Sequence, residues 1–208
     1  MNRNNPWTIA GSALVIIATT GCHATMAPST SPGSSSALPE GRYTNVGTEW
    51  PLKFSAHYFS VSTYSTYDCQ VEYGGRLRAN DPENELQSSS ESLGSRYPDN
   101  MTARMGPIAN FPPPAKVAWR SQDGAQHHAE IDIGEIFSDG LIRHRLRRDE
   151  ISEGRAGPGA LPGIILEVND RTINVYMRAH ISTKDLQEPG NRYSDFRNDL
   201  IKVFSHTY

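Results

Sequence analysis

The chain has 208 residues, of which 37% are hydrophobic and 21% are charged, and its formal net charge is −3. This length fits one folded domain with short extensions, and the hydrophobic content is sufficient for a core that needs no disulfides. The mild negative charge argues against nucleic acid as the main partner, because phosphate backbones are bound by basic surfaces.

The first 21 residues have the layout of a secretory signal peptide. Arg3 precedes an apolar run from Trp7 to Ala18, and small residues follow it up to Gly21. The run is too short to remain in a bilayer as a spanning helix, which needs about 20 apolar residues. We therefore expect residues 1–21 to direct export and then to be removed.

The end of this segment resembles the lipobox of bacterial lipoproteins, in which Gly21 precedes the cut and Cys22 becomes the lipidated first residue. Thr19 departs from the pattern, which prefers an aliphatic residue at that place. His23 follows Cys22 where an aspartate would resemble an inner-membrane signal, so the resemblance implies anchoring at the periplasmic face of the outer membrane. The alternative is an ordinary signal peptide, a chance cysteine and release into the periplasm.

Residues 22–39 form a predicted tether, because they are mostly Ala, Thr, Ser, Pro and Gly and cannot bury a core. Residues 40–208 then make a single globular periplasmic domain. If Cys22 carries lipid, Cys69 is the one cysteine left, so neither an intramolecular disulfide nor a cysteine-rich metal site can form. Its apolar and aromatic neighbours predict a buried structural thiol rather than a reactive one.

The first part of the domain is expected to begin with strands. Residues 50–68 are rich in aromatic and β-branched side chains, which favour strand. A second strand is expected over residues 69–78, with Gly74-Gly75 as a bulge or a bend. Residues 80–110 are polar and rich in Ser, Asn and Pro, so we expect a long loop of the kind that is often functional or mobile.

Two hairpins are predicted further on. Val117 and Trp119 alternate with more polar residues, a turn follows at 121–124, and the return strand extends to residue 133. A helical turn is expected at 134–137. The second hairpin covers residues 164–181 and turns at Asn169-Asp170, with one buried and one solvated face.

The end of the chain has apolar residues at the helical spacing i, i+4, i+7 and i+8, and Ser194 precedes them as a possible cap. These residues are Phe196, Leu200, Val203 and Phe204. The predicted fold class is therefore α+β, an antiparallel sheet of hairpins and a meander with a C-terminal helix packed on it. An all-β sandwich is the alternative.

His128 and Glu130 are the most tempting chemical pair, because alternation on a strand places both on one face, where they could bind a metal or exchange a proton. Two ligands do not make a metal site, so polar residues on a half-exposed strand are the preferred interpretation. The chain has no Gly-x-Ser-x-Gly nucleophile elbow and no phosphate-binding glycine loop. We predict no enzyme activity, no cofactor and no metal.

A basic cluster follows at Arg143, Arg145, Arg147 and Arg148. Such a cluster could meet anionic lipid headgroups or an acidic partner. The alternative is a solvated face that is partly paired with the acids that follow it, Asp149, Glu150 and Glu153. Together with His128 and Glu130, these arginines are the predicted partner-binding residues.

Residues 112–208 are similar to a family of small bacterial lipoproteins. The shared features are Pro-Pro-x-x-Val-x-Trp-Arg-Ser-x-Asp-Gly at 113–124, an acidic strand at 129–133 and a closing hairpin that Pro162-Gly163 opens. Such lipoproteins are often encoded beside type VI secretion lipase effectors and are thought to be their periplasmic immunity proteins. The resemblance implies a partner, a secreted phospholipase or lipase effector, and inhibition by stoichiometric occlusion.

Two other functions stay open at this point. The anchor and tether suit a structural or assembly lipoprotein of the cell envelope equally well. A weaker third hypothesis is a hydrolase or metal enzyme that uses His128 and Glu130.

Overall fold

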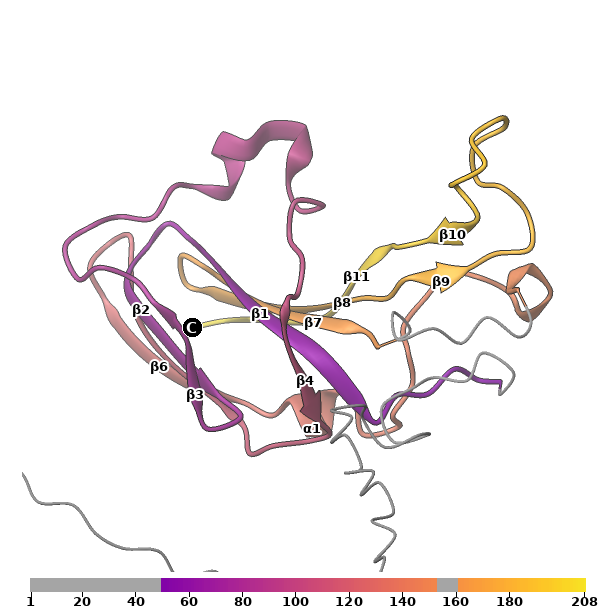
Figure 1. The fold of residues 1–208 in the computed structure, drawn as a ribbon. Helices are drawn as coiled ribbons and strands as arrows, with labels where there is room; N and C mark the ends of the chain where they lie inside the picture. Colours follow the sequence, from indigo (N-terminus) through magenta and orange to yellow (C-terminus); the bar gives the residue numbers. More distant parts are fainter. Residues whose placement is uncertain (1–49, 153–160) are drawn as a thin grey trace, which may run out of the picture. The chain divides into compact units, whose positions relative to one another are not determined.

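The computed structural model describes residues 50–152 and 161–208, which all belong to one compact unit, Ala37–Tyr208. The predicted signal peptide, the lipidation site at Cys22 and the predicted tether lie outside the described residues. Strand is the predominant regular structure of the described chain, and the strands form two main sheets and one small one (Figure 1).

The five-stranded sheet has the order β11-β8-β7-β1-β4. Its strands in chain order are β1 (Ala56–Tyr64), β4 (Met105–Ala109), β7 (Gly163–Asn169), β8 (Thr172–Arg178) and β11 (Leu200–Thr207). β7 and β8 form the predicted second hairpin. β1 and β7 pair in parallel, whereas hairpins and a meander would make every pair antiparallel. A parallel pair joins strands that are far apart in sequence, so no local pattern indicates it.

The four-stranded sheet has the order β3-β2-β5-β6. Its strands are β2 (Thr66–Tyr73), β3 (Arg76–Asn80), β5 (Ala115–Ser121) and β6 (Gln126–Ile131). The predicted hairpin around residues 121–124 is confirmed as β5 and β6. Gly74 and Gly75 have φ values of 61° and 69°, which glycine adopts at little cost, and they form the turn from β2 to β3.

The helical segments are short. They are η1 (Ser90–Arg96), α1 (Ile133–Ile136) and η2 (Arg148–Glu150). The side chain of Asp132 starts α1 by accepting a hydrogen bond from the Glu135 amide at 2.9 Å, which confirms the predicted helical turn. Because η1 and β4 lie within residues 80–110, the expected continuous loop there is wrong in part.

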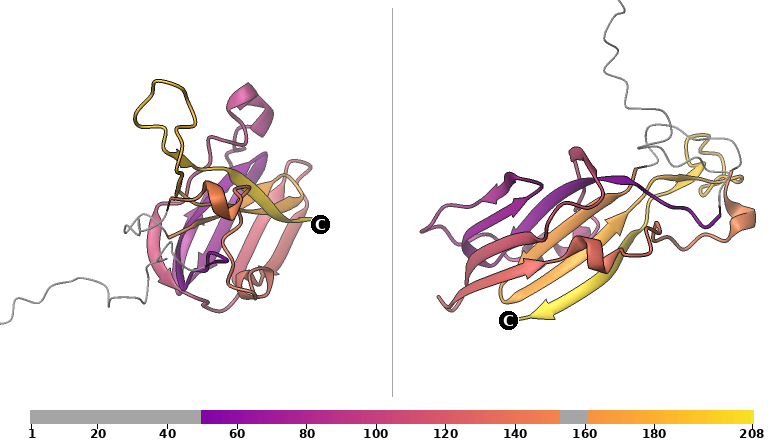
Figure 2. Two further views of the ribbon diagram at one scale, coloured as in Figure 1. Left: turned by 90° about the vertical axis from the view of Figure 1, so that its right-hand side faces the viewer. Right: turned by 90° about the horizontal axis from the view of Figure 1, so that it is seen from below.

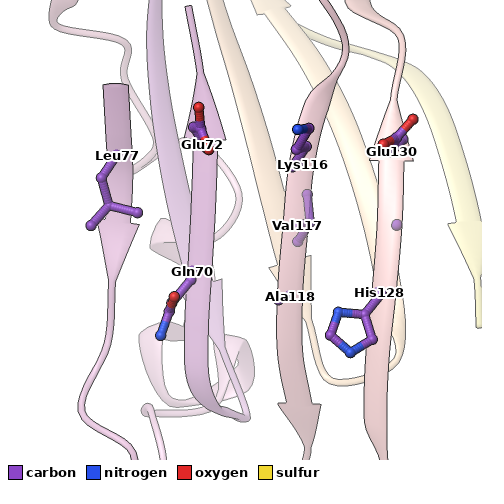
Figure 3. A pocket seen from close by; sticks show the side chains of 9 residues that line it. Gln70, Glu72, Leu77, Lys116, Val117, Ala118, His128 and Glu130 are labelled. Atoms are coloured by element: carbon purple, nitrogen blue, oxygen red, sulfur yellow. The ribbon is translucent and has the colours of Figure 1, made fainter. Parts of the chain in front are cut away.

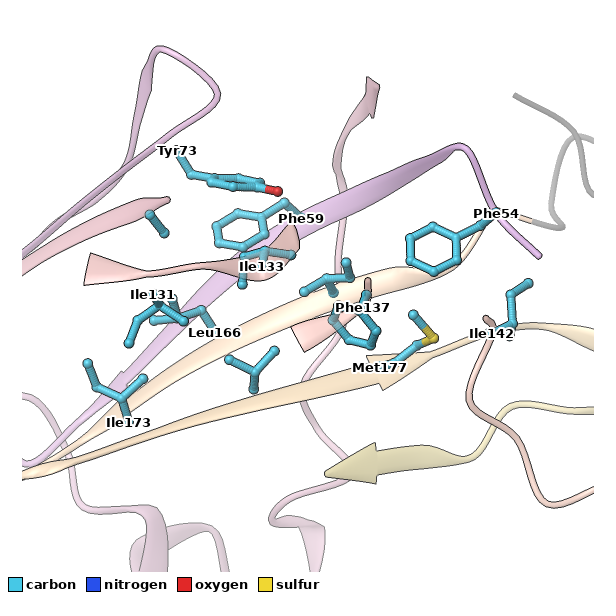
Figure 4. Packing of buried hydrophobic residues seen from close by; sticks show 14 of the residues in the cluster. Phe54, Phe59, Tyr73, Ile131, Ile133, Phe137, Ile142, Leu166, Ile173 and Met177 are labelled. Carbon is cyan, nitrogen blue, oxygen red and sulfur yellow. The ribbon is translucent and has the colours of Figure 1, made fainter. Parts of the chain in front are cut away.

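One hydrophobic core lies between the two main sheets (Figure 4). β7 and β8 contribute side chains that are fully buried, at Ile164, Leu166, Val168, Ile173, Val175 and Met177. The four-stranded sheet contributes Val71, Tyr73, Val117 and Trp119. Cys69 is fully buried in this core and forms no disulfide, so the predicted buried thiol is confirmed, and burial raises the pKa of that thiol.

The opposite face of the five-stranded sheet is buried as well, which corrects the predicted solvated face of the second hairpin. Ile165 and Tyr176 are 0% and 2% exposed and pack with Met101 and Tyr97. Met101 and Tyr97 belong to the segment between β3 and β4, so this segment covers the sheet. The amide of Asn169 also donates a hydrogen bond to the Ser90 hydroxyl at 2.9 Å.

The predicted C-terminal helix is wrong. Phe196 and Arg197 form β10, which pairs with β9 (Ile181–Ser182), and Leu200–Thr207 is β11, which pairs with β8 (Figure 2). The β11–β8 register shifts between Lys202 and Phe204. This irregularity lets the adjacent Val203 and Phe204 both pack on the main core. Counted from Phe196, these two residues are at i+7 and i+8, the spacing that suggested a helix.

Ser194 caps no helix here. Its hydroxyl accepts a hydrogen bond from the Glu188 amide at 2.9 Å and closes the loop before β10. Among residues 50–152 and 161–208, none of the helices has the length and apolar composition needed to cross a membrane.

Candidate functional site

The outer face of the four-stranded sheet carries an open hollow of about 430 Å³ (Figure 3). Side chains from all four strands line it, because alternate residues of each strand point away from the core. Leu77 of β3 is 58% exposed at one side, and the exposed Glu130 of β6 lies at the other.

The strand register explains the order of side chains across this face. Glu72 of β2 is opposite Lys116 of β5, and Lys116 is opposite Glu130 of β6. The next row places Gln70 opposite Ala118, which is opposite His128. One row therefore presents alternating charges beside an apolar side chain, and the other presents an amide and an imidazole.

A second hollow of about 240 Å³ adjoins the first and shares Gln70, Ala118 and His128 with it. Arg120 lines its other end. The guanidinium of Arg120 lies 4.7 Å from the centre of the Tyr67 ring and donates a hydrogen bond to the Glu83 carbonyl. These contacts hold Arg120 against Tyr67 and Glu83 at that end of the second hollow.

The structure places His128 and Glu130 on one face of β6, as the alternation predicted, and both are exposed. Within the described residues, His, Cys, Asp and Glu side chains form no group of three or more that could hold a metal ion. The pair therefore has the geometry of surface residues that line the hollow.

The four predicted arginines differ in their contacts. Arg143 makes an ion pair with Asp139 at 2.8 Å, and Arg147 makes ion pairs with Asp149 at 3.1 Å and Glu150 at 3.6 Å. Arg148 is exposed in η2. The pairing of Arg147 agrees with the alternative interpretation of a solvated face.

Arg145 lines a cavity of about 510 Å³, and the other three arginines are not part of that lining. The cavity brings it together with Arg178, at the end of β8, and Arg197 of β10. Asp99 and Asp199 lie in the same lining. Sequence reasoning missed Arg178 and Arg197, because their proximity depends on β10 and the segment after η1 meeting the end of β8.

A polar link crosses the core between the two sheets. The fully buried His57 of β1 contacts the Asn110 Oδ1 through Nδ1 at 2.8 Å and the Tyr73 hydroxyl through Nε2 at 3.1 Å. The Asn110 amide nitrogen donates to the Phe54 carbonyl at 2.9 Å, so its Oδ1 is the acceptor for His57 Nδ1–H. Nε2 then accepts from Tyr73. Burial lowers the pKa of His57 to about 4.

A second buried polar group lies under the segment that covers the five-stranded sheet. Glu167 of β7 is 0% exposed, and its Oε2 accepts hydrogen bonds from Asn174 at 2.8 Å and from the Tyr176 hydroxyl at 2.9 Å. Burial and the nearby Glu167 carboxylate raise the pKa of Tyr176. A charged residue inside the apolar run of β7 was the available sequence signal for this group.

No known protein family, curated protein or solved structure matches the chain in sequence or in fold.

Proposed function

We propose that the chain is a lipid-anchored periplasmic protein that binds another protein through the outer face of its four-stranded sheet. The observation that carries this proposal is the open hollow of about 430 Å³ across β3, β2, β5 and β6. The backbone of a face formed by regular strands is preorganised, so little backbone ordering opposes association.

The chemistry of the face supports a protein partner. Leu77 supplies exposed apolar area, and Glu72, Lys116 and Glu130 supply a row of alternating charge. Among the described residues Lys116 has no ion-pair partner, so its ammonium is available to a carboxylate of a bound protein. Alternating charge favours one register of the partner, because like charges placed opposite one another are costly.

The specific partner that we propose is a secreted phospholipase or lipase effector of a type VI secretion system. The support is the resemblance of residues 112–208 to lipoproteins that are thought to be immunity proteins, together with the lipobox-like end at Cys22. A lipid anchor would concentrate the inhibitor at the membrane that such an effector attacks. Inhibition would be stoichiometric, by covering the entrance to the lipase active site.

The test is capture of the partner by the full-length protein with a C-terminal tag, expressed in its own organism and extracted from the envelope with detergent. We expect one secreted lipase at one-to-one stoichiometry. The double variant Leu77→Ala, Lys116→Ala should reduce its recovery at least tenfold, which corresponds to about 1.4 kcal/mol.

The matched control removes the same residue types from an exposed segment elsewhere, with Leu186→Ala, Lys184→Ala. Equal losses in both double variants would contradict the proposed surface. Recovery of envelope-assembly proteins in place of a lipase would contradict the immunity function and favour the structural lipoprotein.

A further inference from the structure

We propose that the cavity lined by Arg145, Arg178 and Arg197 binds a small amphipathic ligand through a singly charged oxyanion group. This cavity, called the arginine cavity below, shares no residue with the hollows on the four-stranded sheet. Its volume of about 510 Å³ lies in the range of small-molecule sites. The inference does not depend on the identity of the protein partner.

Charge sets the ligand class. Three guanidinium groups and two carboxylates, those of Asp99 and Asp199, line the arginine cavity and leave one net positive charge. Arg197 is held by Asp199 through its NH2 group at 2.7 and 2.8 Å. The remaining positive charge is complementary to one singly charged group, such as a carboxylate or a phosphodiester.

Two arginines have donors that no described residue uses. Arg145 is exposed and has no hydrogen-bond or ion-pair partner among the described residues. Arg178 donates from NH2 to the Asp99 carbonyl at 3.1 Å and to its carboxylate at 3.2 Å, but its buried Nε has no partner. The exposed guanidinium of Arg145 can therefore donate hydrogen bonds to a ligand oxygen in the cavity.

The rest of the lining consists of the polar Asn198 and three apolar residues. Pro98, Phe196 and Leu200 lie in the wall, and Phe196 is held by stacking on His180 at a ring separation of 4.2 Å. A ligand whose oxyanion group is bound by the guanidinium groups would therefore place its apolar part beside these three apolar residues. Guanidinium groups bind carboxylates and phosphates in a planar, two-pronged geometry that lysine cannot supply.

The experiment titrates the purified full-length protein with four probes and follows binding by calorimetry. Octanoate and dihexanoyl-phosphatidylglycerol carry one negative charge, on a carboxylate and on a phosphodiester. Octanol is the counterpart of octanoate without a charge, and dihexanoylglycerol is the counterpart of dihexanoyl-phosphatidylglycerol without the phosphodiester. We expect one-to-one binding of at least one anionic probe and at least tenfold weaker binding of its uncharged counterpart. The anion that binds identifies the source, a fatty acid or a phospholipid headgroup.

The variant Arg145→Gln should weaken binding of the anionic probe at least tenfold, because it removes the guanidinium of an exposed side chain that lines the cavity. Arg148→Gln is the matched control, since it removes an exposed arginine three positions away that is not part of the lining. Unchanged thermal unfolding shows that each variant is folded.

Equal weakening by both variants would overturn the proposal, because it would mean diffuse attraction to a basic surface. Absence of binding by both anionic probes would overturn it as well. Neither outcome bears on capture of a lipase, which is measured with a different protein and different variants.

Discussion

The two main sheets differ in whether their outer faces are covered by another segment of the chain. The segment between β3 and β4 covers the outer face of the five-stranded sheet, so that Ile165, Glu167 and Tyr176 are all nearly inaccessible. The outer face of the four-stranded sheet is open and presents Leu77, Lys116 and Glu130. The same strand alternation thus yields a buried layer on one sheet and an open, exposed face on the other. Coverage by a distant segment makes the difference.

The sharpest test of this contrast is truncation of one leucine on each sheet. Leu166→Ala in β7 should lower the free energy of unfolding by about 4 kcal/mol, because the side chain is 0% exposed and its removal leaves a cavity. Leu77→Ala should change it by less than about 0.5 kcal/mol, because that side chain is 58% exposed. Urea denaturation measures both, and comparable losses would contradict the assignment of Leu77 to an open face.

The core between the sheets should respond to pH through His57. The folded-state pKa is lowered to about 4 from 6.5, so the unfolded chain binds the proton first as the pH falls. The His57 contribution to stability is complete above about pH 6.5 and is lost as the pH falls towards about 4. This shift corresponds to about 3 kcal/mol.

Denaturation at several pH values from 7 to 4 measures this loss, and the folded variant His57→Gln supplies the control. The difference in stability between the native protein and this variant should shrink as the pH falls. A difference that stays constant over the same range would contradict a buried neutral imidazole.

The smallest expected effect concerns two tyrosine hydroxyls on the two outer faces. Tyr176→Phe should cost about 2 kcal/mol, because it removes a donor at 2.9 Å from the buried carboxylate of Glu167. Tyr67→Phe on the open face should cost less than about 0.5 kcal/mol, because the ring that faces Arg120 is retained. Thermal unfolding compares the two, and similar losses would mean that the covered face is wetter than its burial indicates.

Local patterns predicted the hairpins well. Alternation around Val117 and Trp119 and the turn at Gly124 correctly placed β5 and β6 and the common face of His128 and Glu130. Alternation likewise located β7 and β8. It did not reveal that both faces of that hairpin are buried. Polar residues such as Glu167 and Asn174 normally indicate a solvated face, and here they are buried because they form a hydrogen bond with each other.

The C-terminal error has a specific cause. Period-two alternation identifies a strand when every residue stays in register, and the shift between Lys202 and Phe204 breaks it. Val203 and Phe204 then both face the core, so the strand takes on the spacing of an amphipathic helix. Strong pairing with β8 decides the outcome over local propensity.

The two candidate sites also differ in how far the sequence could predict them. His128 and Glu130 could be assigned to one exposed face from sequence, because neighbours on one strand determine it. The arginine cavity could not, because Arg145, Arg178 and Arg197 belong to three separate segments. The basic run from Arg143 to Arg148 instead resolves into ion pairs for Arg143 and Arg147 and a cavity position for Arg145.

Sequence by itself determined the strand-rich hairpins, the turns and the buried Cys69, because alternation and turn chemistry act over a few residues. Tertiary structure alone decided the parallel pairing of β1 with β7, the covering of one sheet face and the assembly of the arginine cavity. Each of these features depends on which segments, distant in sequence, pack against one another and exclude water. The packing of the whole domain determines those contacts.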